Sequence, residues 1–394
     1  MPSCCSTSPI LRSVTWWRAS ESTSSRDGPD HVVDRPVRRV AGADHRLARD
    51  RKRDGKSNEA GVKYYLLGVF ASGVMLYGMS LIFGTTGSTK LVDIAVSLGE
   101  GDLIAIQVLG VTFVIIGFAF KISAVPFHTW APDTYEGAPT PVTAFLSVAS
   151  KTAGLGAISS LVFIAFPAAD EVYQPLLWVL SALTMTIGNV IALRQTNMVR
   201  MLAYSSVSQG GFILMPLAVA GSGDAAEPAL KAVVVYLLIY AFTNLGAFAV
   251  VIAAARKTPS GSISSFGGLF VYAPGLTVLM TIFLASLAGV PPLGGWFAKF
   301  GAFRAVLEAD TNAGYALAVV GAVNTVIATA YYMKVMRVMW MADVPDGDIT
   351  PVVTPAPVQA ALAITAAGTL ALGVLPSLVV RFGDIADLSG ALGR

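Results

Sequence analysis

Three lysines lie inside long apolar stretches of the sequence: Lys121, Lys151 and Lys299. Lys151 is about ten residues from either end of its stretch, which in a helix corresponds to a depth of about 15 Å. A charge at that depth costs about 3 kcal/mol on insertion scales, so such residues usually face a protein interior or a water-filled cavity and take part in ion movement. Burial favours the neutral amine and a nearby charge shifts the balance, so a buried lysine can take up and release a proton. The three lysines therefore predict a proton path across a membrane.

Each lysine also has a structural interpretation. Lys121 lies near the end of its stretch, where its side chain can snorkel to the membrane interface. Lys151 suits a buried ion pair, and Lys299 suits the end of a helix. No Asp or Glu lies in the middle of an apolar stretch, which disfavours a sodium site built from carboxylates.

Two of these lysines lie beside interruptions rich in proline and glycine, "FKISAVPFH" and "AGVPPLGGWFAKF". A break in a membrane helix frees amides and carbonyls that only protein or water can satisfy. Paired interruptions of this kind are typical of transporters built from inverted repeats, with the ion site at the breaks. The candidate break residues are Pro126, Pro291, Pro292, Gly294 and Gly295.

Polar residues near the lysines are candidate accessories of the path. His128 is predicted to shuttle protons between the surface and Lys121, because an imidazole titrates near neutral pH; simple hydrogen bonding is the alternative. Asp133 and Glu136 are expected to cap or orient the loop between the second and third spans, in which they lie. A later apolar stretch carries Tyr204, Ser205, Ser208 and Gln209, which either line a wetted path or hold helices together.

The composition indicates a membrane protein. Of 394 residues 54% are hydrophobic and only 13% are charged, with a mean hydropathy of +0.66; soluble domains carry about 25% charged residues. Two adjacent cysteines, Cys4 and Cys5, exclude a disulfide scaffold and a cysteine-ligated zinc or iron–sulfur site. Three dispersed histidines and the absence of nucleotide-binding motifs predict that the chain itself holds no metal and no cofactor.

The charge is divided unevenly along the chain. Residues 1–57 hold 12 Lys and Arg against 7 Asp and Glu, whereas residues 58–394 hold 15 against 17. The overall charge of +3 therefore comes from the first segment and does not indicate nucleic-acid binding. We expect residues 1–57 to be a disordered, non-homologous or artefactual basic extension, because they contain no apolar run long enough for a signal peptide. Residues 58–394 are the predicted transmembrane domain.

The elements that must position the lysines are predicted to be membrane helices, since the alternating pattern of a barrel is missing. The fold class is therefore all-α, a polytopic helix bundle with broken helices. Lys and Arg are more frequent in one set of loops, which predicts a cytoplasmic amino end and an outer carboxyl end. Nine candidate spans lie near residues 62–83, 104–127, 141–166, 175–193, 201–221, 229–255, 275–307, 313–341 and 356–379.

From Glu59 to about Met341 the sequence resembles subunit N of the bacterial proton-pumping NADH–quinone oxidoreductase, respiratory complex I, within the antiporter-like family. The resemblance implies a fold of about fourteen helices with two inverted repeats. It places Lys121 and Lys299 on the lysines of the two broken helices and Lys151 on the central lysine of the next helix. The segments that carry it are "EAGVKYYLLGVFASG", "FKISAVPFHTWAPDTYEGAPTPVTAFLSVASK", "GNVIALRQTNMVRMLAYSSVSQGGFIL" and "MTIFLASLAGVPPLGGWFAKF".

The resemblance implies a subunit of a translocase in the bacterial cell membrane that moves protons while other subunits pass electrons from NADH to quinone. Its partners would be the other membrane subunits, the lipid bilayer and, through the complex, the quinone pool; flavin and iron–sulfur clusters would lie elsewhere. Two departures stand out. Residues 1–57 replace the first helices of relatives, one of which carries a glutamate that pairs with the first lysine, so the chain looks truncated. Gln209 stands where relatives often have histidine.

Two other functions remain open at this point. One is a subunit of a multi-subunit cation/proton antiporter or of a membrane hydrogenase, which share the scaffold. The other is a truncated remnant that does not pump.

Overall fold

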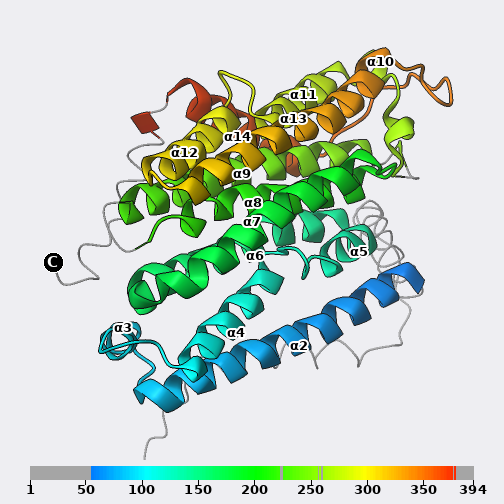
Figure 1. Cartoon of the computed structure of the whole chain (residues 1–394). Coiled ribbons are helices and arrows are strands. Elements are labelled where there is room, and N and C mark those ends of the chain that lie inside the picture. The colour runs from blue at the N-terminus through cyan, green and yellow to red at the C-terminus, as the bar shows by residue number, and fades with distance from the viewer. Residues whose placement is uncertain (1–54, 222–224, 256, 259–260, 376, 379–394) are drawn as a thin grey trace, which may run out of the picture. The chain divides into compact units, whose positions relative to one another are not determined.

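The computed structural model describes residues 55–221, 225–255, 257–258, 261–375 and 377–378. Nearly all of the extension predicted at residues 1–57 lies outside the described residues. The described chain belongs to one compact unit, Asp54–Arg394, whose first helix, α2, begins at Gly55. Secondary structure in these ranges is helical apart from an isolated bridge between Asn197 and Ser262 (Figure 1). The all-α membrane fold is therefore confirmed.

Six helices of the described residues are long and apolar enough to cross a membrane. They are α2 (Gly55–Thr86), α6 (Thr140–Ser160, continued by a π-turn to Ala165), α7 (Asp170–Leu193), α9 (Ala226–Ala254), α13 (Asn312–Met341) and α14 (Ala356–Val374). The other helices are α3 (Leu91–Leu98), α4 (Ala105–Lys121), α5 (Trp130–Gly137), α8 (Met198–Leu214), α10 (Leu269–Tyr272), α11 (Pro274–Ala288) and α12 (Gly294–Glu308).

Each of the nine predicted ranges contains a helix, but three of them are not single full-length helices. The range 104–127 holds α4, which ends at Lys121, and the range 201–221 holds α8, which gives way to a 3₁₀ turn at Pro216. The range 275–307 holds two helices, α11 and α12, separated by residues 289–293. Proline ends a helix because it lacks the N–H that the helical ladder needs.

Helix α9 occupies the middle of the bundle and contacts α6, α8, α11, α12 and α14. In an apolar stretch of 18 residues within α9, 72% is buried inside the bundle, whereas in the corresponding stretch of α2 only 17% is buried. An apolar helix that exposes its side chains suits contact with lipid, and small residues then allow close packing on the other face. Gly78 of α2 meets the backbone of Gly110 in α4, where a Cβ atom would lie 2.8 Å from the Gly110 oxygen.

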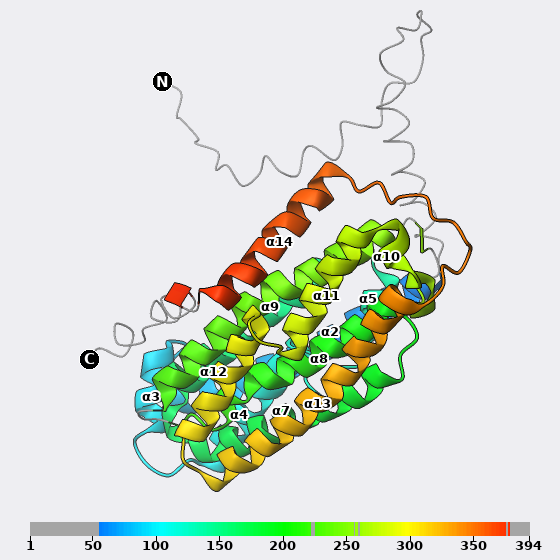
Figure 2. The same ribbon diagram turned by 90° about the horizontal axis from the view of Figure 1, so that it is seen from above.

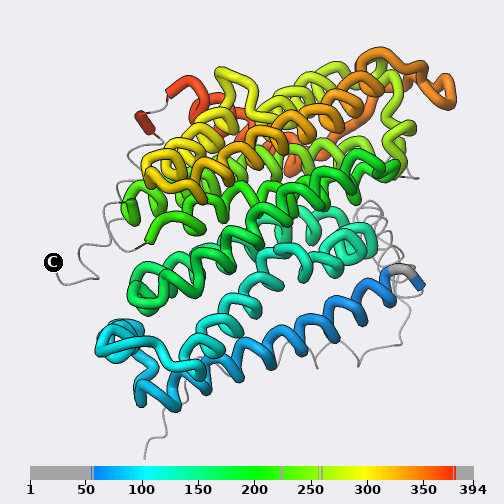
Figure 3. Tube along the Cα trace, in the orientation of Figure 1, coloured from blue at the N-terminus to red at the C-terminus, as the bar shows by residue number. Residues whose placement is uncertain are grey.

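The order of the helices places both interruptions against α8. Figure 3 follows the chain from α4 through an unwound segment into α5, and Figure 2 shows α11 and α12 beside α9, which both of them contact. Helix α8 contacts α5, α6, α7, α9 and α12. The polar residues of α8 can therefore reach both breaks.

Candidate proton-transfer site

The first break lies between α4 and α5, at residues 122–129. The indole of Trp130 donates to the Phe120 oxygen at 3.0 Å, and the amide of Val125 donates to the Thr184 hydroxyl of α7 at 2.9 Å. Ser123 adopts a left-handed conformation with φ of 61°, and Pro126 lies inside the break. Side chains of neighbouring elements thus satisfy part of the backbone that the break frees.

Lys151 is 1% exposed and lies on α6 beside this break. Its ammonium donates to the oxygen of Ile122 at 3.1 Å and to the oxygen of Ser206 at 2.6 Å. Ile122 caps the carboxyl end of α4, where the last carbonyls have no partner inside the helix and the dipole is negative. The break therefore supplies one of the two acceptors of this buried ammonium, and α8 supplies the other.

The second break repeats this arrangement. Lys299 is 4% exposed, and its ammonium donates to the oxygen of Ala288, the last residue of α11, at 2.9 Å. It also lies 4.8 Å from the centre of the Phe212 ring. The next residue, Gly289, has a φ of +90°, and a Cβ atom there would lie 2.9 Å from the Lys299 side chain. Only glycine fits both the conformation and the space at this position.

The predicted break residues divide between the loop and the helix that follows it. Pro291 and Pro292 lie in the break, whereas Gly294 and Gly295 are the first residues of α12. The amide of Gly295 donates to the Ser286 hydroxyl at 2.9 Å, and a Cβ atom on Gly295 would lie 1.7 Å from the Ser286 oxygen. Glycine therefore permits the close approach of α12 to α11.

Polar side chains of α8 connect the surroundings of the two buried lysines. The amide of Gln209 donates to the oxygen of Leu287 at 3.1 Å, next to the carbonyl that holds Lys299. Its own oxygen accepts from the Tyr236 hydroxyl at 2.6 Å, and its amide nitrogen lies 3.3 Å from the Tyr332 hydroxyl. Ser205 shares a 2.5 Å hydrogen bond with Tyr332. Helix α8 thus contacts Lys151 through Ser206 and the second break through Gln209.

Lys121 differs from the other two lysines because it is exposed. It is the last residue of α4 and lines a cavity of about 750 Å³ between α2, α4 and α6, together with Tyr64, Gly68 and Gly154. The structure therefore brings Lys151 and Lys299 to buried helix breaks and leaves Lys121 on an open groove.

The remaining accessory candidates are His128, Tyr204 and Ser208. The His128 ring lies 6.3 Å from the ring of Tyr204 in α8. Among the described residues, His128 Nδ1 and the buried hydroxyl of Ser208 have no hydrogen-bond partner. The predicted transfer from His128 to Lys121 stays a prediction.

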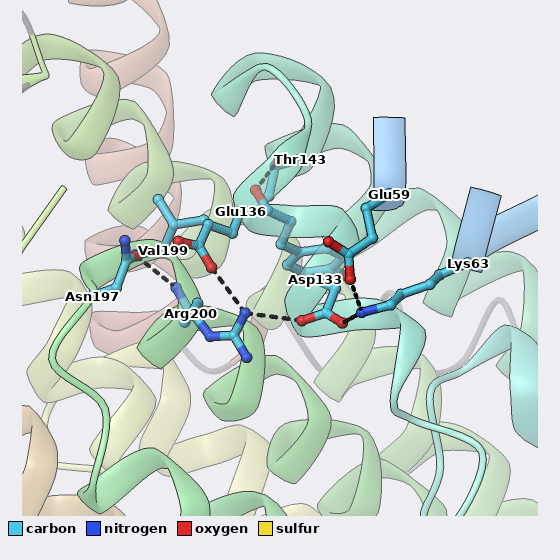
Figure 4. A network of polar contacts seen from close by, with 9 residues as sticks. Glu59, Lys63, Asp133, Glu136, Thr143, Asn197, Val199 and Arg200 are labelled. Atoms are coloured by element: carbon cyan, nitrogen blue, oxygen red, sulfur yellow. Dashed lines mark hydrogen bonds and ion pairs between the residues drawn. The ribbon is translucent and has the colours of Figure 1, made fainter. Parts of the chain in front are cut away.

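The two acidic residues after the first break form a network of ion pairs (Figure 4). Arg200 Nη1 bonds Asp133 at 2.9 Å and Glu136 at 2.8 Å, and Lys63 bonds the second oxygen of Asp133 at 2.9 Å and Glu59 at 2.7 Å. Burial raises the pKa of Asp133, but the hydrogen bonds from Lys63 and Arg200 outweigh it and hold that pKa below its usual range.

Sequence reasoning missed several polar residues of the bundle interior. Tyr236 and Tyr240, four residues apart on α9, face the polar side chains of α8, and the Tyr240 hydroxyl donates to Ser206 at 2.8 Å. Asn189 donates to the Asn324 side chain at 3.1 Å and accepts from Tyr331 at 3.1 Å, across α7 and α13. Tyrosines at helical spacing inside apolar stretches were the available signal, because a buried phenol needs a partner.

The described residues contain no group of three or more His, Cys, Asp or Glu that could hold a metal ion. The absence of a metal or cofactor from the chain stays a prediction.

Comparisons with known proteins agree on the family. The family of the transmembrane region of NADH:quinone oxidoreductase and Mrp antiporters matches residues 45–327. NADH-quinone oxidoreductase subunit N of Trichlorobacter lovleyi is 43% identical over 331 residues, covering 83% of this chain and 66% of the relative. Subunit N 1 of Herpetosiphon aurantiacus is 44% identical over 338 residues, covering 84% and 67%. The chain thus spans about two thirds of the length of these curated relatives.

Solved structures show the same fold. A chain of respiratory complex I from Thermus thermophilus with bound aureothin is 30% identical, with a TM-score of 0.68 over 84% of this chain and 70% of that chain. A chain of the Mrp complex from Dietzia sp. is 24% identical, with a TM-score of 0.73 over 85% and 68%; this likeness concerns the fold alone. The polytopic chain, similar to subunit N, therefore belongs to the NADH:quinone oxidoreductase/Mrp antiporter family of membrane proteins.

Proposed function

We propose that this chain is a proton-translocating membrane subunit of an NADH–quinone oxidoreductase in a bacterial cell membrane, with its amino end in the cytoplasm. The observation that carries the proposal is the pair of buried lysines, each bonded to the carbonyl end of a broken helix. An amine in such a place can hold a proton against the helix dipole and release it when the surrounding charge or geometry changes.

The proposed path runs through Lys151, α8 and Lys299, with Lys121 at the open groove. Gln209, Ser205 and Tyr332 supply hydrogen-bonding groups between the two breaks. His128, Tyr204 and Ser208 are proposed accessories, and the unpartnered buried atoms of His128 and Ser208 suit ordered water. The side chains of this chain move protons, whereas flavin and iron–sulfur clusters carry electrons from NADH to quinone in partner subunits.

The similarity to subunit N at more than 40% identity favours this function over that of an antiporter subunit. The second candidate, a subunit of a cation/proton antiporter, is favoured only by the fold shared with the Mrp complex. Purification of the tagged chain from membranes distinguishes the two. We expect it to co-purify with a flavin- and iron–sulfur-containing arm, whereas small hydrophobic antiporter subunits would support the alternative.

Replacing Lys151 with alanine tests the path itself. We expect Lys151→Ala in the assembled complex to lower proton pumping and quinone reductase activity together, by about ten-fold or more, because a group that carries the proton is lost. Both rates are measured in membrane vesicles, with Lys334→Ala as the control because Lys334 is exposed on α13. Normal pumping by an assembled Lys151→Ala complex would refute the proton-carrying role.

A further inference from the structure

The short helix α5 is attached to its neighbours at both ends. At its first residue, Trp130 donates to the oxygen of Phe120 and so ties α5 to the end of α4. One turn further, Asp133 and Glu136 lie three residues apart, on the same face of the helix. Asp133 bonds Lys63 of α2 with one oxygen and Arg200 of α8 with the other, so a single carboxylate joins three helices.

Arg200 occupies an unfavourable place for a cation. It lies in the first turn of α8, where its backbone amide and that of Val199 donate to the N-cap Asn197, and where the helix dipole is positive. Its side chain is 28% exposed, and those of Asp133 and Glu136 are 30% and 29% exposed. Partly buried, cross-linked pairs of this kind contribute more than isolated surface pairs. The carboxylates of Asp133 and Glu136 therefore compensate the positive charge of Arg200, and these ion pairs tie α8 to α5.

Arg200 holds α8, the helix that contacts the surroundings of both Lys151 and Lys299. Tyr204, one turn after Arg200, faces His128, and the Ser206 oxygen accepts from Lys151 at 2.6 Å. Three residues later, Gln209 donates to the end of α11. A shift of the amino end of α8 would change the distance between the Ser206 carbonyl and the ammonium of Lys151.

We propose that Arg200 is a positioning residue, which fixes α8 against α5 through Asp133 and Glu136 and so sets the contact between Ser206 and Lys151. The inference rests on the proposed function of Lys151 as a proton carrier. Arg200 lies outside the path and acts through the placement of α8. The number of protons pumped per NADH oxidised therefore depends on this cluster, beyond its effect on stability.

The test compares Arg200→Gln with Arg200→Lys in the assembled complex. Glutamine removes the charge, whereas lysine keeps a cation that can bond both carboxylates, as the single nitrogen Nη1 does here. Lys151→Ala removes the carrier and lowers both rates together, whereas Arg200→Gln keeps the carrier but misplaces its contact with Ser206. We therefore expect Arg200→Gln to lower the ratio of protons pumped to NADH oxidised by about two-fold or more, and Arg200→Lys to restore most of it. Loss of folded protein alone lowers both rates equally and leaves the ratio unchanged.

Arg304→Gln is the matched control. Arg304 pairs with Glu308 four residues away on the same helix and is 67% exposed, so its loss should leave the ratio unchanged. Glu136→Gln removes one of the two carboxylates and leaves the pair between Arg200 and Asp133. If Arg200→Gln does not assemble, the ratio measured for Glu136→Gln tests the positioning role instead. We expect it to lower the ratio by less than Arg200→Gln does.

An unchanged ratio in assembled Arg200→Gln, or in Glu136→Gln where the former does not assemble, would overturn the positioning role. Failure of lysine to restore the ratio would overturn it as well. Lys151→Ala, measured in parallel, separates this failure from that of the proposed function. If Lys151→Ala lowers both rates together while the Arg200 variants keep the normal ratio, only the inference about Arg200 fails.

Discussion

At the scale of single residues, the protein places amines and amides where helix breaks leave carbonyls without partners. Lys151 bonds the oxygen of Ile122, Lys299 that of Ala288, and Gln209 that of Leu287. A backbone oxygen that no longer takes part in a helix must find another donor when it is buried. The same contacts therefore satisfy the break and hold the side chains proposed to carry protons.

Gln209 offers a direct test of this arrangement. Gln209→Leu leaves the buried hydroxyl of Tyr236 and the oxygen of Leu287 without their partner, which costs about 1–3 kcal/mol for each unsatisfied group. We expect a lower temperature of thermal inactivation for the complex that contains this variant. Gln359→Leu, at an exposed position of α14, should have little effect. Equal inactivation temperatures for the two variants would contradict the assigned contacts of Gln209.

At the scale of elements, short helices and unwound segments are held by contacts with α2, α7 and α8. The first break is fixed by Trp130 and by the hydroxyl of Thr184, and the helix after it is fixed by Asp133. An eight-residue helix is too short to be stable by itself, so these tertiary contacts decide whether α5 forms.

The depressed pKa of Asp133 predicts how α5 responds to pH. A carboxylate whose folded-state pKa lies below its unfolded value of about 4 contributes its full stabilisation above pH 4, and loses it as the pH falls through the lower value. We expect the protection of α5 amides in hydrogen–deuterium exchange, corrected for the intrinsic rate, to stay constant from pH 8 to pH 5. A progressive loss of protection across that range would contradict the ion-pair assignment.

At the scale of the whole molecule, the packing separates one lysine from the other two. Lys121 lies on the groove between α2, α4 and α6, whereas α9 and its neighbours enclose Lys151 and Lys299. Helix α2 forms one wall of this groove and has the least buried apolar stretch of the six long helices. The described bundle is therefore dense around α8 and α9 and open beside α4.

Chemical labelling of amines measures this difference. In membranes that contain the chain alone, we expect a small amine-reactive reagent to modify Lys121 well before Lys151 and Lys299. Of these three lysines, Lys121 is exposed and the other two are buried. Mass spectrometry of the digested chain reports the modified fraction of each lysine, and exposed Lys334 provides the positive control. Equal labelling of Lys121 and Lys151 would contradict the burial that the structure assigns.

The sequence by itself determined the class of fold, because apolar length is a local property, and its prolines indicated two segments where helices are interrupted. Only the tertiary structure decided that Lys121 is exposed, that His128 lies beside Tyr204, and that Arg200 bonds carboxylates more than sixty residues earlier in the chain. Such contacts depend on how helices pack against one another, and apolar periodicity indicates which face of a helix is buried without indicating its neighbour.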